Sequence, residues 1–244
     1  MTILRNTEET IDKDQSIYKQ IEIKKQTITP KEIFEKRLFN VFVFGLPRSG
    51  TSMMTHALEL LGVKMIYTSE DPEKKEKMDE RYKKTLGEKY HPNEAGFFEV
   101  TQDLFDHYLE ILSTPYAGCK MIIPVRRPIF DVVKYNPGAK VIQMWRDPEE
   151  IRQSQQAFYR GDAIEEAESR VAMMRTQLAT QKLTLENHKI DTLHVQYRDV
   201  LDNPLGKIQE IAHFINAPNV IDAAVNSINP KVNRFRKEEL VLGI

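Results

Sequence analysis

An apolar run at residues 41–44 leads into a glycine-framed loop, and a helical pattern begins directly after it. Such a loop exposes backbone N–H groups at a helix N-terminus, where partial positive charge favours binding of phosphate or sulfate. A Walker A loop reads G-x-x-x-x-G-K-[ST], but here Gly50 is followed by Thr51, and the cation, Arg48, comes earlier. The loop therefore favours an anion other than the β- and γ-phosphates of a magnesium nucleotide.

A second cationic residue follows a strong apolar run at 140–145. Arg146 leaves the end of this predicted strand, Pro148 opens a predicted helix, and Ser154 lies within that helix. A guanidinium is a planar fork that suits phosphate, and a serine hydroxyl can donate beside it. An arginine after a strand is also a common structural ion-pair partner, so this pattern alone leaves both roles open.

Taken together, the motifs resemble those of the sulfotransferases that use 3′-phosphoadenosine 5′-phosphosulfate (PAPS), especially the bacterial and Golgi-type branches. The family's loop reads G-x-x-[RK]-S-G-T-[ST] and its second motif R-[DN]-P-x-[DE]-x-x-x-S, matched here at residues 45–52 and 146–154. Two further family segments, N-P-x-G-[FY]-[FW]-E and Y-E-D-L-x-x-[DN]-P, are echoed at residues 93–99 and 197–204. All four motifs follow the family's order along the chain.

The resemblance implies a donor with two anionic ends and therefore two anion sites. Arg48 would be the loop cation, while Arg146 and Ser154 would bind the 3′-phosphate. Tyr197 would lie near the adenine, or else be a core tyrosine at a strand end. Arg236, in a basic cluster, would reach the 3′-phosphate or belong to a solvated tail. The residues expected to bind the donor are Gly45, Pro47, Arg48, Ser49, Gly50, Thr51, Ser52, Arg146, Ser154, Tyr197 and Arg236.

The catalytic base has more than one candidate in the sequence. Cytosolic sulfotransferases use the histidine of a K-x-H-x-P segment, but the similar stretch at residues 120–124 has Ile122 at that position. Glu99 is the leading candidate, because it ends an echo of a family motif and follows two phenylalanines that can raise its pKa by desolvation. The alternatives are that Glu99 caps the next helix or that His91 is the base. Lys120 is expected to assist the leaving group.

Composition sets broad limits on the chain. Its 244 residues, 41% of them hydrophobic, suffice for a full core, and its net charge of −1 favours neither nucleic acid nor a membrane surface. A single cysteine, Cys119, excludes an internal disulfide. The first 25 residues are polar, and no apolar segment reaches the roughly 18–20 residues that span a bilayer. We therefore expect a soluble, cytoplasmic protein with no nucleic-acid or membrane partner.

Short apolar runs alternate with helical patterns, which predicts an α/β fold: a P-loop-like three-layer sandwich with a mostly parallel central sheet and helices on both faces. We expect an N-terminal arm and short helix at residues 1–39 and a sulfotransferase domain at 40–244. The charged stretch at 70–92 is either a solvated helix with a loop or a lid over the site. Strands are predicted at 41–44, 121–123, 140–145 and 192–197, and helices after Thr29, at 51–61, around 104–112, before 133, and at 148–159, 162–187 and 204–215.

The sequence thus predicts a metal-independent transfer of a sulfuryl group from PAPS to an acceptor hydroxyl or amine, with adenosine 3′,5′-bisphosphate (PAP) as product. A P-loop nucleotide kinase or NTPase is one alternative, and a non-catalytic nucleotide-binding protein on the same scaffold is another. The acceptor is open among carbohydrates, lipids, small metabolites and peptide tyrosines.

Overall fold

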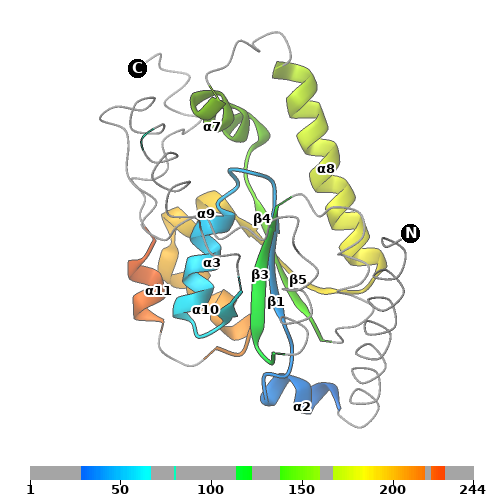
Figure 1. The fold of residues 1–244 in the computed structure, drawn as a ribbon, viewed down its shortest axis with the longest axis vertical. Helices are drawn as coiled ribbons and strands as arrows, with labels where there is room; N and C mark the ends of the chain where they lie inside the picture. The colour runs from blue at the N-terminus through cyan, green and yellow to red at the C-terminus, as the bar shows by residue number, and fades with distance from the viewer. Residues whose placement is uncertain are drawn as a thin grey trace, which may run out of the picture.

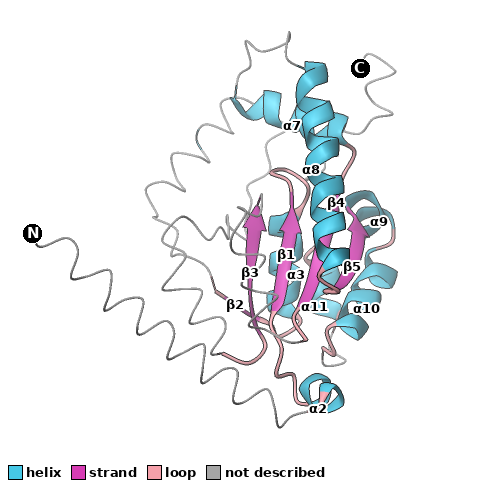
Figure 2. Cartoon of the chain, turned by 90° about the vertical axis from the view of Figure 1, so that its right-hand side faces the viewer, coloured by secondary structure: helices cyan, strands magenta, loops and turns pink. Residues whose placement is uncertain are grey.

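The computed structural model describes residues 29–66, 80, 114–122, 138–159, 167–217 and 221–228. In this part of the chain, five parallel strands form one sheet in the order β2-β3-β1-β4-β5; Figure 1 labels β1, β3, β4 and β5, and Figure 2 also labels β2. The strands are β1 (Val41–Gly45), β2 (Lys64–Met65), β3 (Ala117–Ile122), β4 (Lys140–Trp145) and β5 (Asp191–Gln196). The helices are α2 (Pro30–Glu35), α3 (Thr51–Leu60), α7 (Pro148–Tyr159), α8 (Ala167–Asn187), α9 (Tyr197–Asp202), α10 (Pro204–Phe214) and α11 (Asp222–Asn226).

Strand β1 lies at the centre of the sheet, between β3 and β4, and all five of its residues are buried. A strand covered on both faces needs apolar residues at successive positions, which explains its continuous apolar run. Val43 packs into the core on one face, whereas Phe42 and Phe44 pack into the core on the other. The parallel pairing places the carboxyl ends of β1 and β4 side by side.

Helices cover both faces of this sheet, as the sequence predicts (Figure 2). On one face, Met54 and Leu58 of α3 and Ile208 of α10 pack with residues of β1 and β4. On the other face, α8 contributes Leu185 to the second core cluster. A third, smaller cluster joins the loop after β1 to α7 and α8 through Leu46, Ile151, Met174 and Leu178.

Several predicted boundaries are confirmed by the structure. The Thr29 hydroxyl and the Glu32 carboxylate form the capping box of α2, and Asn203 caps α10 by accepting a hydrogen bond from the backbone N–H of Gly206. Gly62, expected at the end of α3, has a φ of 90°, the left-handed conformation that follows many helices. The proposed division of the chain at residue 40 stays a prediction.

Other elements differ from the predictions. Strand β3 begins at Ala117, earlier than the sequence predicts. The prediction misses this start because alanine and glycine, here Ala117 and Gly118, have low strand propensity. Gly118 is required there, since a Cβ atom would lie 2.0 Å from the Val41 carbonyl oxygen of β1. The predicted strand at 192–197 ends at Gln196, because Tyr197 already begins α9, a helix that was not predicted. Strand β2 and helix α11 were also not predicted.

The stretch at 70–92 lies outside the described residues except for Glu80, and so do the helices predicted around 104–112 and before 133. Among the helices that the structure describes, none combines the length and apolar character needed to cross a membrane.

Trp145, the only tryptophan in the sequence, ends β4 next to Arg146, and its Nε1–H donates to Nδ1 of His194 on β5 at 3.3 Å. Burial is the main cause that lowers the pKa of His194 from 6.5, Lys182 lowers it further, and Glu186 raises it. As the pH falls through this lowered pKa, Nδ1 gains a proton and can no longer accept the bond. We therefore predict that tryptophan fluorescence changes reversibly with a midpoint below pH 6.5.

In the His194→Phe variant, which has no acceptor, the same titration should be flat. A midpoint above pH 6.5, or an unchanged titration in the variant, would contradict the assigned bond. The stability effect has the same direction: because the folded-state pKa lies below the unfolded value, the free energy of unfolding should fall as the pH drops below about 6.5.

Candidate anion-binding site

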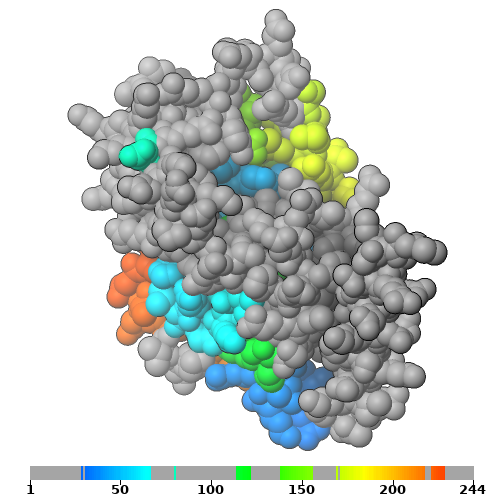
Figure 3. All heavy atoms as spheres, viewed as in Figure 1, coloured from blue at the N-terminus to red at the C-terminus, as the bar shows by residue number. Residues whose placement is uncertain are grey.

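The loop after β1 is closed by its own side chains. The Ser49 backbone N–H and hydroxyl both donate to the Leu46 carbonyl oxygen, at 3.1 and 2.7 Å, and Ser49 is fully buried. A Cβ atom at Gly45 would lie 2.5 Å from Ser49 Oγ and 2.8 Å from Thr51 Cγ2. The missing side chain of Gly45 therefore leaves room for the Ser49 and Thr51 side chains in the turn between β1 and α3. Part of this segment reaches the surface next to α8 (Figure 3).

Two residues of the loop have left-handed backbone conformations. Arg48 has a φ of 71° and Gly50 a φ of 93°. A left-handed conformation costs a residue with a Cβ atom about 1–2 kcal/mol, so Arg48 needs surrounding contacts to hold it there. Two such contacts are present: Arg48 Nε donates to Ser154 Oγ of α7 at 3.1 Å, and the Arg48 carbonyl oxygen accepts from Arg146 Nη1 at 3.0 Å.

Arg146 follows β4 directly and is only 8% exposed. Its Nε donates to Glu150 Oε2 of α7 at 3.1 Å, and its Cζ lies 4.5 Å from the centroid of the Tyr197 ring. The guanidinium is thus held in place by the loop carbonyl, by a carboxylate and by an aromatic face. Tyr197, the first residue of α9, is 5% exposed, and its ring also lies against Gly50.

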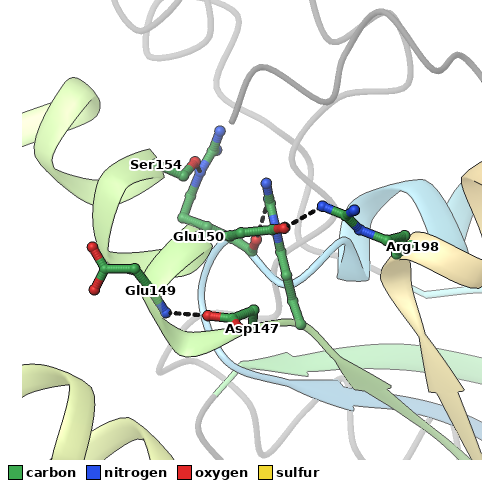
Figure 4. Close-up of polar contacts among 7 residues, drawn as sticks. Asp147, Glu149, Glu150, Ser154 and Arg198 are labelled. Carbon is green, nitrogen blue, oxygen red and sulfur yellow. Dashed lines mark hydrogen bonds and ion pairs between the residues drawn. The ribbon is translucent and has the colours of Figure 1, made fainter. Parts of the chain in front are cut away.

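Glu150 contacts a second arginine. Its Oε1 accepts from Arg198 Nη2 at 2.7 Å, and its side chain is 5% exposed (Figure 4). In the same view Glu149 points to the opposite side of α7, where it pairs with Arg152. Sequence analysis did not single out Glu150 or Arg198 as functional. The two residues lie 48 positions apart, and no local spacing indicates that they meet.

Lys120 reaches the loop from the neighbouring strand. It lies opposite Val43 in the register of β3 with β1, is 2% exposed, and donates from Nζ to Ser52 Oγ at 3.0 Å. Ser52 is in the first turn of α3, the position at which a helix favours negative charge. A buried ammonium at this position is well placed to attract an anion held by the loop.

The structure thus brings together most of the side chains predicted to bind the donor. Arg48 and Ser154, which were assigned to opposite ends of the donor, are in direct contact. Arg48, Lys120, Arg146 and Arg198 bring four cationic side chains close to the N-termini of α3 and α7, and Glu150 offsets one of these charges. Such an arrangement favours a multiply charged anion.

The remaining candidates stay predictions. Glu99, His91 and Arg236 lie outside the described residues.

Cys119 is buried in the core, and desolvation raises the pKa of its thiol to about 12, which excludes a reactive thiolate. Across the described ranges, no group of three or more His, Cys, Asp or Glu residues could hold a metal ion.

Comparison with known proteins identifies a family. Residues 40–213, more than half of the chain, match the family model described as a sulfotransferase domain. A comparison with curated proteins finds no match.

Solved structures match in part, with low sequence identity. Retinol dehydratase in complex with androsterone and PAP has a TM-score of 0.44 and 18% identity, over 80% of this chain and 65% of that one. Mouse sulfotransferase SULT7A1 complexed with PAP has a TM-score of 0.49 and 14% identity, over 85% and 68% of the two chains. The sulfotransferase domain of the Synechococcus PCC 7002 olefin synthase has a TM-score of 0.41 and 17% identity, over 83% and 82%. The match thus spans less than two thirds of the length of retinol dehydratase. The assignment of this chain to a family rests on the family model alone.

The loop geometry predicts the effect of replacing Gly50. Gly50 and Gly62 both have a positive φ, but a Cβ atom at Gly50 would lie 2.3 Å from the Tyr197 ring, whereas nothing lies within 4 Å of one at Gly62. Gly62→Ala should lower the free energy of unfolding by about 1–2 kcal/mol through backbone strain alone. Gly50→Ala should cost about 1–3 kcal/mol more, because the aromatic ring must move. Urea unfolding measures both, and equal losses would contradict the close contact.

Proposed function

Because this chain belongs to the sulfotransferase family, we propose that it transfers a sulfuryl group from PAPS to an acceptor hydroxyl or amine and releases PAP. The observation that supports the proposal is that the loop motif at residues 45–52 and the second motif at residues 146–154 are in direct contact. The loop cation Arg48 bonds to Ser154, and Arg146 bonds to the Arg48 carbonyl oxygen. A donor with phosphates at the 5′ and 3′ positions requires cationic groups for both ends. The contact network supplies them next to two helix N-termini.

We propose that the loop, Arg48 and Lys120 bind the 5′-phosphosulfate end. Negative charge builds on the leaving phosphate during sulfuryl transfer, and preorganised donors aimed at such charge contribute about 3–4 kcal/mol each. Lys120 is already fixed by Ser52 and shielded from water, so it needs little rearrangement to serve as one of them. This loop lacks the lysine of a Walker A loop, and Lys120 of β3 thus supplies the corresponding positive charge.

We propose that Arg146 and Ser154 bind the 3′-phosphate. Arg146 has its Nε and Nη1 atoms engaged by the protein, which fixes the plane of the guanidinium and aims it. The Tyr197 ring stacks on this guanidinium and is almost fully buried. Tyr197 therefore contributes to donor binding chiefly by holding Arg146, whether or not the adenine also touches it.

The kinase alternative requires a lysine from elsewhere in the chain together with a magnesium-binding carboxylate. Lys120 meets the first requirement, but the family match favours sulfuryl transfer. The non-catalytic alternative predicts nucleotide binding with no transfer. Incubation with labelled PAPS and pools of carbohydrate, lipid, small-metabolite and tyrosine-peptide acceptors distinguishes it from the enzyme and identifies the acceptor class.

Removal of either arginine should strongly weaken donor binding. In calorimetry, Arg48→Ala and Arg146→Ala should each lower the affinity for PAP by at least about 100-fold, because each removes charge-assisted hydrogen bonds to a phosphate. Arg175→Ala, at an exposed position of α8, is the matched control and should bind like wild type. Unchanged affinity in both site variants, or binding of ATP only with magnesium, would contradict the proposed donor.

We propose Glu99 as the base that takes the acceptor proton. A positioned base contributes about 10²–10⁴ in rate, so Glu99→Gln should lower turnover by at least about 100-fold. Its affinity for PAP should stay within about twofold of wild type, since a base facing the acceptor makes no contact with the nucleotide. Glu210→Gln, at an exposed position of α10, is the control. A wild-type rate for Glu99→Gln would move the search to His91.

A further inference from the structure

The contact between Glu150 and Arg198 has no role in the function proposed above. Glu150 accepts a hydrogen bond from Arg146 at 3.1 Å through one oxygen and from Arg198 at 2.7 Å through the other. The side chains of Arg146 and Glu150 are 7% and 5% exposed, whereas that of Arg198 is 35% exposed. A buried carboxylate is therefore shared between one buried and one accessible guanidinium.

This sharing determines how much positive charge Arg146 can offer a phosphate. A carboxylate paired with a single arginine cancels the charge of that arginine, and the cancellation is strong where water is excluded. A second arginine on the same carboxylate restores a net positive charge to the three groups. The additional charge comes from Arg198, which follows Tyr197 at the start of α9.

The residue at position 198 differs from the one in the motif that this segment resembles. The family motif at this position reads Y-E-D-L, and in this chain the second residue is Arg198. With a glutamate there, a second negative charge would follow Tyr197, next to the arginine that must bind a phosphate. With an arginine there, Glu150 instead gains a second cationic partner.

We propose that Arg198 is a positioning residue of the 3′-phosphate site: by binding Glu150, it keeps the charge of Arg146 available to the 3′-phosphate of the donor. The inference rests on the proposed function, because it concerns binding of a nucleotide with a 3′-phosphate. Arg198 acts through Glu150 and does not itself contact the phosphate. The alternative is a purely structural ion pair that fastens α9 to α7.

Calorimetry with two nucleotides separates these roles. Arg198→Gln should weaken binding of PAP about tenfold, which is 1.4 kcal/mol. It should change binding of adenosine 5′-monophosphate, which lacks the 3′-phosphate, by less than about twofold, because the 5′ site lies at the loop. Arg198→Lys, which keeps the charge, should recover most of the PAP affinity. Arg152→Gln is the matched control: it removes an arginine paired with Glu149 on the other side of α7.

A double-mutant cycle tests the route through Glu150. In Glu150→Gln the residue at position 150 has no negative charge for Arg198 to offset, and the PAP affinity of this variant is the reference for the cycle. Adding Arg198→Gln to this variant should then change the affinity by less than about twofold. Thermal unfolding of each variant gives the structural contribution of the pair separately.

The result that supports the inference is a selective loss of PAP affinity in Arg198→Gln that disappears in the Glu150→Gln background. If Arg198→Gln weakens the binding of PAP and of adenosine 5′-monophosphate equally, Arg198 has only a structural role, and the inference is overturned. A loss that persists without the Glu150 charge would overturn the route through Glu150. Unchanged PAP affinity in Arg198→Gln would overturn the inference and leave the proposed function intact, whereas a wild-type chain that fails to bind PAP would overturn both.

Discussion

The guanidinium of Arg146 is the point at which the separate parts of the site meet. Arg146 follows the last residue of β4. Its guanidinium donates to the carbonyl oxygen of Arg48 in the loop after β1, bonds to Glu150 on α7 and lies against the Tyr197 ring at the start of α9. A buried cation is stable only when its hydrogen-bonding groups and charge are satisfied by the surrounding protein. The position of Arg146 therefore constrains the loop, both helices and the anion that they can bind together.

The fold explains why these contacts can form. Because β1 and β4 are parallel neighbours, the loop and Arg146 leave the sheet at the same edge. The apolar cluster of Leu46, Ile151, Met174 and Leu178 holds α7 and α8 against that loop, which fixes Ser154 close to Arg48. Gly50 lets the Tyr197 ring pack directly against the loop backbone. Packing of apolar residues therefore determines where the cationic side chains lie.

Local patterns in the sequence predict the parts of this arrangement that depend on neighbouring residues. The continuous apolar runs, the capping box at Thr29 and the asparagine cap at Asn203 place the central strands and several helices correctly. Helix α9 was not predicted because its residues follow β5 without a turn or breaking residue. The contact between Glu150 and Arg198 was not predicted either, because it depends on how two helices from different strands pack together.

A crystal structure of the chain with bound PAP would show directly whether one nucleotide joins the two motifs. We expect its 5′-phosphate on the loop at residues 45–52, near Lys120, and its 3′-phosphate within hydrogen-bond distance of Arg146 and Ser154. We also expect Glu150 to stay bonded to both arginines. A nucleotide bound elsewhere, or one whose 3′-phosphate lies away from Arg146, would rule out this arrangement.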